Sequence, residues 1–339
     1  MMKEKTVSVI IPVYNPGDCL EKCINSLLTQ TYKKLEIILV NDASSDGSDI
    51  ICKKFAESSN LFKYIEHKEN KGQTITRNDG VAVAEGEWLI FLDSDDYFEP
   101  DALSFLVEAS EKYKSEIVLS NYKTVKDNGI ETTYTTDLKE GLYSTKELLN
   151  SLFTDIRIEL LSCIGTKLYR NNFIKNKKPK TADYIKTNYD LAFILDALSA
   201  NPNIAYVNRV SYVYYQHAGS ITYSYRNNMF LNVTKARERF LPLLKENGCY
   251  ESKKLSYHMT RYATITWSLG QEITFKKGYK HFKEVFFSIC DDWDTGETIK
   301  VICHESPSRI QRFIVKLLGS KNNCLIAYFL FRLFKRGHK

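Results

Sequence analysis

The sequence lacks the marks of a zinc-binding, disulfide-bonded or membrane-spanning protein. Its eight cysteines include no C-x-x-C pair and no cysteine–histidine cluster at zinc-ligand spacing. Cys19 and Cys23 lie one helical turn apart in an apolar stripe, which favours buried thiols and a reducing compartment over a disulfide. No stretch approaches the roughly 18 to 20 apolar residues of a spanning helix, and the run from Val7 to Val13 is too short for a signal-peptide core. We therefore expect a cytoplasmic protein, soluble or bound peripherally at the inner face of the cell membrane.

Two common phosphate-binding motifs are also missing. No G-x-G-x-x-G follows the first predicted strand and no G-x-x-x-x-G-K-[ST] occurs, so neither a dinucleotide cradle nor a P-loop is indicated. The excess of 47 Lys and Arg over 41 Asp and Glu gives a net charge of +6 in 339 residues, too little to indicate a nucleic-acid partner. The basic excess is concentrated at the end of the chain, which has no acid after Glu305.

What the sequence does contain is a regular alternation of apolar runs and amphipathic segments. Strands are predicted at residues 7–15, 35–40, 62–66, 88–92, 116–122, 206–207 and 210–215, and helices at 18–31, 49–57, 76–84 and 102–113. Ser144 and Glu147 form a capping-box signature before a helix expected at 148–153, and Ser306 is expected to cap a helix that starts at Pro307. Alternating strands and helices with short connections are typical of a mostly parallel sheet with helices on both faces. The predicted fold class is therefore α/β and Rossmann-like, and the helical pattern beyond Tyr225 predicts an α-helical C-terminal extension.

The apolar run at 88–92 stops abruptly on three carboxylates, Asp93, Asp95 and Asp96. Such a run is typical of a strand buried on both faces of a parallel sheet, so the acids fall at its C-terminal end, where open α/β sheets bind ligands. Two aspartates spaced Asp-x-Asp can aim oxygens at one hard divalent cation that keeps other positions for water or phosphate. The pattern indicates a metal-and-diphosphate site. The alternative is that Asp95 and Asp96 cap the helix predicted just beyond Pro100.

Two further strand ends carry side chains suited to a nucleotide. Tyr14 and Asn15 follow the first strand and Asp42 the second, and the ends of parallel strands share one rim. Asp42 can accept hydrogen bonds from a base N–H or a ribose hydroxyl, Tyr14 offers a ring face, and Arg77 can grip phosphate oxygens two at a time. Each residue alone is compatible with ordinary loop or surface chemistry. Their coincidence is what favours a nucleotide site.

The order and spacing of these segments resemble glycosyltransferase family 2, over residues 7 to about 120. The matching segments are Val9–Asn15, Gln30–Tyr32, Glu36–Ser48, Asn70–Gly72, Arg77–Gly80, Ala84–Glu87 and Phe91–Asp96. The resemblance implies a GT-A fold that binds a nucleotide-diphosphate sugar, usually uridine-linked, with Mn²⁺ or Mg²⁺ on Asp93 and Asp95. The nucleotide-sugar contacts are expected at Pro12, Val13, Tyr14, Asn15, Asp42, Asn70, Gly72, Arg77, Asp93, Ser94, Asp95 and His217. One departure from the family pattern is Asn41, where an aspartate is common.

The second half of the chain resembles the family more sparsely. Thr166–Arg170 is similar to a Lys-Leu-Tyr segment that precedes the acceptor site, and Asp190 aligns with the catalytic base. Tyr189 stands where the family usually has a glutamate. Inverting transfer requires, on chemical grounds alone, one carboxylate that takes the acceptor hydroxyl proton. The competing interpretations are a helix cap at Asp190 and a packing role for His217.

The predicted organisation has three parts. Residues 1–122 form the nucleotide-sugar-binding half of a GT-A domain, 123–224 its acceptor-binding and catalytic half, and 225–339 a helical region with a basic amphipathic end. That end is compatible with peripheral contact to an anionic membrane and equally with packing on the core or in a subunit interface of a homo-oligomer.

The sequence thus predicts an inverting, metal-dependent glycosyltransferase. It would move a sugar from a nucleotide-diphosphate donor, expected to be UDP-linked, to a hydroxyl of a glycan or lipid-linked acceptor in cell-surface polysaccharide synthesis. Two rivals stay open at this point. A sugar nucleotidyltransferase would carry a glycine-rich basic loop where this chain has residues 12–15, and a membrane-associated scaffold would need no catalysis.

Overall fold

Two compact units make up the chain. The computed structural model describes residues 5–152, 159–177, 189–217, 225, 229–275 and 277–336. Residues 1–151 with 157–220 form unit 1, and residues 152–156 with 221–339 form unit 2. The predicted boundary after residue 224 falls beside residues 218–224, which lie outside the described part. All the predicted site residues belong to unit 1.

Unit 1 is built on one mixed sheet in the order β3-β2-β1-β4-β9-β6-β10-β5, with β7 paired to β6 and β8 to β10. The strands are β1 Val7–Val13, β2 Leu35–Asn41, β3 Phe62–Glu66, β4 Trp88–Phe91, β5 Tyr97–Phe98, β6 Ile117–Lys126, β7 Glu131–Tyr134, β8 Gly141–Tyr143, β9 Lys167–Arg170 and β10 Ile204–Gln216. Strands β1, β2, β3, β4, β6 and β10 run in one direction, and β5, β7, β8 and β9 run against them. The predicted α/β fold with a mostly parallel sheet is confirmed.

One detail of that sheet differs from the prediction. Strand β4, which precedes the acidic residues, pairs parallel with β1 but antiparallel with β9, so it lies where the strand direction in the sheet reverses. An unbroken apolar run reports burial on both faces and carries no information about the direction of its neighbours.

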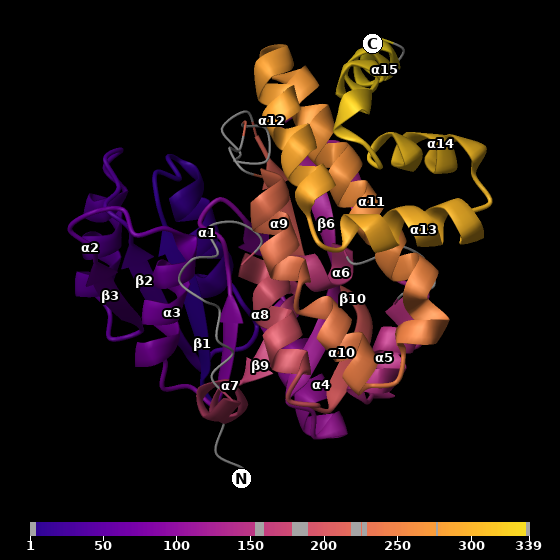
Figure 1. Ribbon diagram of the computed structural model, residues 1–339. Helices are drawn as coiled ribbons and strands as arrows, with labels where there is room; N and C mark the ends of the chain where they lie inside the picture. Colours follow the sequence, from indigo (N-terminus) through magenta and orange to yellow (C-terminus); the bar gives the residue numbers. More distant parts are fainter. Residues whose placement is uncertain are drawn as a thin grey trace. The chain divides into compact units, whose positions relative to one another are not determined.

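Helices cover both faces of this sheet (Figure 1). Those of unit 1 are α1 Cys19–Leu28, α2 Ser48–Ser58, α3 Gln73–Val83, α4 Ala102–Tyr113, α5 Thr145–Leu152, α6 Glu159–Ser162, α7 Asn171–Lys177 and α8 Tyr189–Leu198, with a short 3₁₀ turn η1 at Ile164–Thr166. Alternate side chains of β1, among them Val9 and Ile11, share a core with apolar residues of α1, α2 and α4. On the other face, a Cβ at Gly80 of α3 would lie 2.4 Å from Cγ2 of Ile10, so this close approach requires glycine. Phe91, beside Ile10 in the sheet, packs against α8, which places α3 and α8 on the same face.

Most predicted elements are present, with local corrections. Ser144 and Glu147 form the predicted capping box, since Glu147 Oε2 accepts from Ser144 N at 2.8 Å and Ser144 Oγ accepts from Glu147 N at 3.3 Å. The two strands predicted at 206–207 and 210–215 are one irregular strand, β10. All eight cysteines are free thiols.

Unit 2 is helical. Its helices are α9 Met229–Arg237, α10 Phe240–Glu246, α11 Tyr250–Thr274, α12 Gly278–Asp291, α13 Thr295–Glu305, α14 Arg309–Leu317 and α15 Cys324–Arg336, with a 3₁₀ turn η3 at Lys321–Asn323. Helix α14 begins after Ser308, whose side chain accepts from Gln311 N. The predicted cap at Ser306 was therefore two residues early. The apolar core joins residues of α9, α11, α12, α13, α14 and α15.

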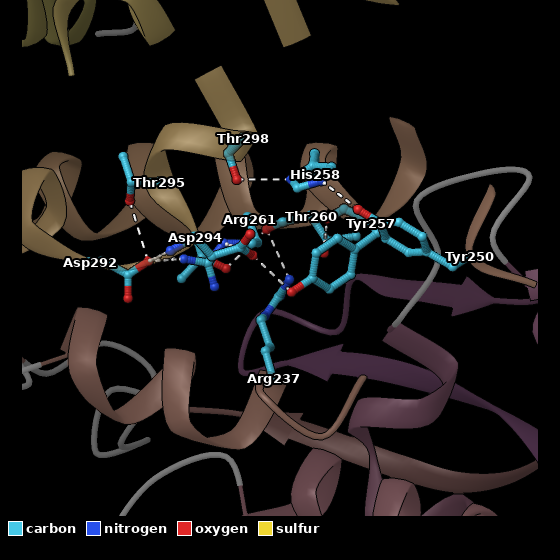
Figure 2. A network of polar contacts seen from close by, with 11 residues as sticks. Arg237, Tyr250, Tyr257, His258, Thr260, Arg261, Asp292, Asp294, Thr295 and Thr298 are labelled. Carbon is cyan, nitrogen blue, oxygen red and sulfur yellow. Dashed lines mark hydrogen bonds and ion pairs between the residues drawn. The ribbon is translucent and has the colours of Figure 1, made fainter. Parts of the chain in front are cut away.

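A buried polar network fastens α11 to the start of α13 (Figure 2). Arg261 pairs with Asp292 and, through Nε at 2.9 Å, with Asp294, which also accepts from Tyr257 Oη at 2.9 Å. His258 Nδ1 lies 2.9 Å from Thr298 Oγ1, and burial lowers the pKa of His258 to about 4. The imidazole is therefore neutral near pH 7 and acts as a hydrogen-bonding spacer between the two helices.

Candidate active site

Arg77 joins two carboxylates that lie far apart in the sequence. Its Nη2 is 2.5 Å from Asp93 Oδ1, just beyond β4, and its Nη1 is 3.0 Å from Asp190 Oδ1 in the first turn of α8. The guanidinium side chain is 1% exposed, whereas the two carboxylates are 28% and 27% exposed. The predicted metal ligand and the predicted base therefore meet at one buried cation.

Tyr189 holds Arg77 in place. The guanidinium carbon lies 5.0 Å from the centre of the Tyr189 ring, and Tyr189 Oη donates to Asn78 Oδ1 at 3.3 Å. A cation over a desolvated aromatic face is stabilised by the ring quadrupole. The tyrosine that replaces the usual glutamate thus supplies a neutral surface against Arg77 in place of a third carboxylate.

Asp190 is tuned by opposing effects. Burial raises its pKa, the charge of Arg77 lowers it, Asp93 raises it and Lys167 lowers it, with a net rise. Lys167 of β9 is completely buried, donates to the Cys163 carbonyl and to Thr166 Oγ1, and burial lowers its own pKa to about 8. A carboxylate with a raised pKa is a better proton acceptor once ionised. In the described part of the chain its ion-pair partner is Arg77, a contact that the helix-cap interpretation did not anticipate.

The other two acids of the run have different surroundings. Burial and the charge of Asp93 raise the pKa of Asp95, whose Oδ2 lies 3.5 Å from Nε2 of His217. Asp96 is buried and accepts from Tyr212 Oη at 2.5 Å and from Tyr215 N at 2.8 Å, which fixes the acidic loop to β10. Helix α4 begins only at Ala102, so the interpretation of Asp95 and Asp96 as its caps is wrong.

The acidic loop has the chemistry of a hard-cation site. Among the contacts of the described residues, Asp93 uses one oxygen toward Arg77 and Asp95 one toward His217. The mutual repulsion that contributes to the raised pKa of Asp95 is the effect a divalent cation would relieve. No group of three or more His, Cys, Asp or Glu in the described ranges is arranged to hold a metal. A cation here would therefore take two protein carboxylates and complete its shell with water and diphosphate oxygens.

Asp42 is held from three sides. Its Oδ1 accepts from Lys71 N at 2.8 Å and lies 2.7 Å from His67 Nδ1, and its Oδ2 accepts from Gly72 N at 2.8 Å. Gly72 is the N-cap residue of α3 with φ of 88°, a conformation that favours glycine. The carboxylate thus sits at the positive end of the helix that carries Arg77. It is 3% exposed.

His67 is a functional candidate that sequence reasoning missed. Its Nε2 lies 2.9 Å from Asp79 Oδ2 and its Nδ1 2.7 Å from Asp42 Oδ1, so each ring nitrogen faces a carboxylate. Lys167 and Tyr212 were likewise not identified as site residues. Lys167 lies in the segment Thr166–Arg170 that the family resemblance covered. Tyr212 lies outside the matching segments, and a single histidine after a strand carries no pattern.

The remaining predicted contacts lie at the ends of β1 and β2. Pro12 and Val13 are buried in β1, Tyr14 is 51% exposed, and Ser94 lies buried between Asp93 and Asp95. Asn15, with φ of 50°, accepts from Ser45 N at 2.7 Å and so ties the two strand-end loops together. Asn70 is exposed in the loop that Asp42 holds. Asn41, where the family commonly has an aspartate, donates to Tyr64 Oη and accepts from Ser44 N. The side chain at this position is therefore engaged in local hydrogen bonds.

A mostly parallel sheet whose acids beyond β4 meet an arginine of α3 and a carboxylate of α8 is typical of sugar-transferring enzymes of the GT-A fold. The fold of residues 1–349 of Staphylococcus aureus TarS, crystallised with UDP-GlcNAc, matches with a TM-score of 0.70 at 18% identity, over 98% of this chain and 92% of that one. The model of the family described as Glycosyl transferase family 2 matches residues 8–170.

The chain belongs to glycosyltransferase family 2. It is 30% identical to EpsH of Bacillus subtilis over 78% of its own length and 77% of that protein. It is also 30% identical to glycosyltransferase GlyA of Streptococcus pneumoniae, of which it spans 37%. The poly(ribitol-phosphate) β-N-acetylglucosaminyltransferase TarP of Staphylococcus aureus is 24% identical over 95% of this chain and 97% of its own. The family resemblance predicted from sequence is confirmed, and with it the prediction of an enzyme that transfers sugars.

Proposed function

We propose that the protein transfers a sugar, with inversion, from a UDP-sugar to a hydroxyl group of a glycan or lipid-linked saccharide, with a divalent cation at Asp93 and Asp95. The observation that carries the proposal is the meeting of Asp93 and Asp190 at Arg77. The TarS complexes with UDP-GlcNAc and UDP support the donor class. Mannosyltransferase PcManGT of Pyrobaculum calidifontis, solved with GDP-Man and Mn²⁺, matches the fold with a TM-score of 0.53 and supports metal use.

Each residue then has one task. Asp190 takes the proton of the acceptor hydroxyl. At the same time the hydroxyl oxygen attacks the anomeric carbon of the donor sugar, and the bond between that carbon and the diphosphate oxygen breaks. Arg77 keeps Asp190 oriented and places a positive charge beside the leaving group. When bound, the divalent cation would offset the negative charge that grows on the leaving diphosphate. Tyr14, Asn15 and the loop held by Asp42 receive the nucleoside.

The test separates donor binding from chemistry. A panel of sugar nucleotides is screened for Mn²⁺-dependent release of nucleoside diphosphate, and thermal unfolding is followed with UDP and Mn²⁺. We expect UDP with Mn²⁺ to raise the melting temperature, because a ligand that binds only the folded state stabilises it. Asp190→Asn should lower transfer by at least about 100-fold while this thermal shift persists.

Asp137→Asn, at an exposed position, is the matched control and should retain activity. Retention of transfer by Asp190→Asn would remove Asp190 from the role of base. A melting temperature unaffected by UDP, GDP and metal would show that the donor site is misplaced, and release of pyrophosphate from a nucleoside triphosphate would favour the nucleotidyltransferase.

A further inference from the structure

Helix α15 has two apolar faces. Cys324 and Ala327 are buried in the core of unit 2, yet Leu325, Ile326, Phe329 and Leu333 are 51%, 53%, 53% and 63% exposed. At 100° per residue these four outward side chains fall within a sector of about 100° on the helix. Core packing therefore accounts for only one side of this helix.

Helix α14 repeats the arrangement and adds charge. Val315 is buried, whereas Ile310 and Phe313, on the opposite side of the helix, are 62% and 54% exposed. By helical spacing the exposed residues Arg309 and Lys316 lie on the same side as these two apolar residues. The outward face thus has large apolar groups flanked by cations.

The charge of the segment has one sign. From residue 306 to the end the chain has eight Lys and Arg and no Asp or Glu. Among the described side chains of this segment, one Lys or Arg forms an ion pair with a carboxylate: Lys321 Nζ lies 2.7 Å from Asp291 Oδ2. The cations beside the exposed apolar residues are therefore available to an anionic partner.

An anionic bilayer surface fits this face better than a second copy of the chain. In a two-fold symmetric dimer the same patch meets itself, which would place cations opposite cations with no carboxylate in the segment to pair with them. At a bilayer surface, by contrast, phenylalanine and leucine enter the boundary between head groups and acyl chains while Lys and Arg meet anionic lipid. In the part of the chain that the structure describes, none of the helices has the length and hydropathy of a membrane span.

We propose that the outward faces of α14 and α15 form a membrane-docking surface, centred on Ile310, Phe313, Phe329 and Leu333, that binds bilayers containing anionic lipid. This assignment concerns where the enzyme works and stands apart from which sugar it transfers. Its success or failure leaves the donor-site experiments unaffected.

The test is co-sedimentation of the full chain with vesicles of phosphatidylcholine alone or mixed with phosphatidylglycerol. We expect binding to the anionic vesicles, weakened by added salt because surface charges are screened. Phe329→Ser with Leu333→Ser should weaken binding by at least about tenfold, since each exposed apolar side chain contributes to insertion. Arg309→Glu with Lys316→Glu should weaken it by more than about 25-fold, at roughly fivefold for each charge removed.

Matched controls use exposed positions in unit 1. Ile50→Ser, at a side chain 68% exposed, and Lys33→Glu with Lys34→Glu should leave binding unchanged. A cooperative thermal unfolding transition, at a Tm close to that of the unsubstituted protein, shows that each variant is folded. Absence of binding by the folded full chain, or equal binding by all variants, overturns the proposal. So does a dimer in sedimentation velocity that Phe329→Ser with Leu333→Ser converts to a monomer.

Discussion

Replacing Arg77 by methionine tests the centre of the site. Methionine keeps much of the packing volume and removes the cation that Asp93 and Asp190 share. Removing one partner of a buried ion pair costs about 3–5 kcal/mol, and the partial exposure of both carboxylates favours the lower end. We therefore expect a loss of about 3 kcal/mol at pH 8, or a fall in Tm of roughly 6–12 °C for a unit of about 200 residues.

The loss should depend on pH with a defined sign. Burial raises the pKa of Asp190, and removing Arg77 removes the charge that opposes this rise. When the folded-state pKa lies above the unfolded value, the unfolded state ionises first, so stability falls as pH rises between the two values. The destabilisation of Arg77→Met should therefore be smaller at pH 5 than at pH 8.

Thermal unfolding at both pH values measures the effect. Arg209→Met is the matched control, because the ion pair of Arg209 with Asp101 is half exposed and should contribute no more than about 1 kcal/mol. A fall in Tm for Arg77→Met no larger than for Arg209→Met, or one that is independent of pH, would refute the electrostatic reasoning.

Three further substitutions probe the surroundings of the site. His67→Ala should raise the donor KM about tenfold with little change in kcat, because the Asp42 carboxylate, which holds the 70–72 loop, loses one of its three partners. Steady-state kinetics with varied donor concentration measure both constants, and a fall in kcat at unchanged KM would contradict this role. Tyr189→Glu places a second carboxylate beside Asp190 and should move the acid limb of the kcat/KM profile to higher pH, by about one unit, and an unmoved limb would contradict the assigned base. Gly80→Ala should lower the free energy of unfolding by about 1–3 kcal/mol, because the new methyl group would clash with Ile10 of β1. Gly296→Ala, with open space around it, should be neutral or slightly stabilising, and equal changes in Tm for the two variants would contradict the packing argument.

The strand ends could be predicted from sequence because an apolar run that stops on polar residues marks both a strand and its exit. β1, β2 and β3 follow this rule, and β3 has the predicted bounds of Phe62–Glu66. Strand β9 was not predicted, because four residues beside a 3₁₀ turn carry too short a pattern. The antiparallel pairing of β9 with β4 is the reason that the strand direction reverses beside β4.

The site shows a similar division. Asp93, Arg77 and Asp190 were each proposed from local motifs, yet their shared contact depends on packing between α3 and α8 that no local pattern reports. The alternative interpretation of Asp96 as a helix cap was wrong for the same reason, since its partners Tyr212 and Tyr215 lie more than 100 residues further along the chain. Ionisable groups are assigned by neighbours in space, and a lone sequence shows only neighbours along the chain.

The anchoring of Asp42 has a consequence for engineering donor preference. An ionised carboxylate offers about four acceptor positions, and three are taken internally by His67, Lys71 and Gly72. Among the contacts of the described residues this leaves one acceptor position for the nucleobase contact that we propose, so a library randomised at this residue would loosen the turn before α3 in most members and confound base choice with misfolding. Variation at the solvent-facing Tyr14 leaves that turn intact and is the sounder starting point for redirecting the enzyme to another nucleotide.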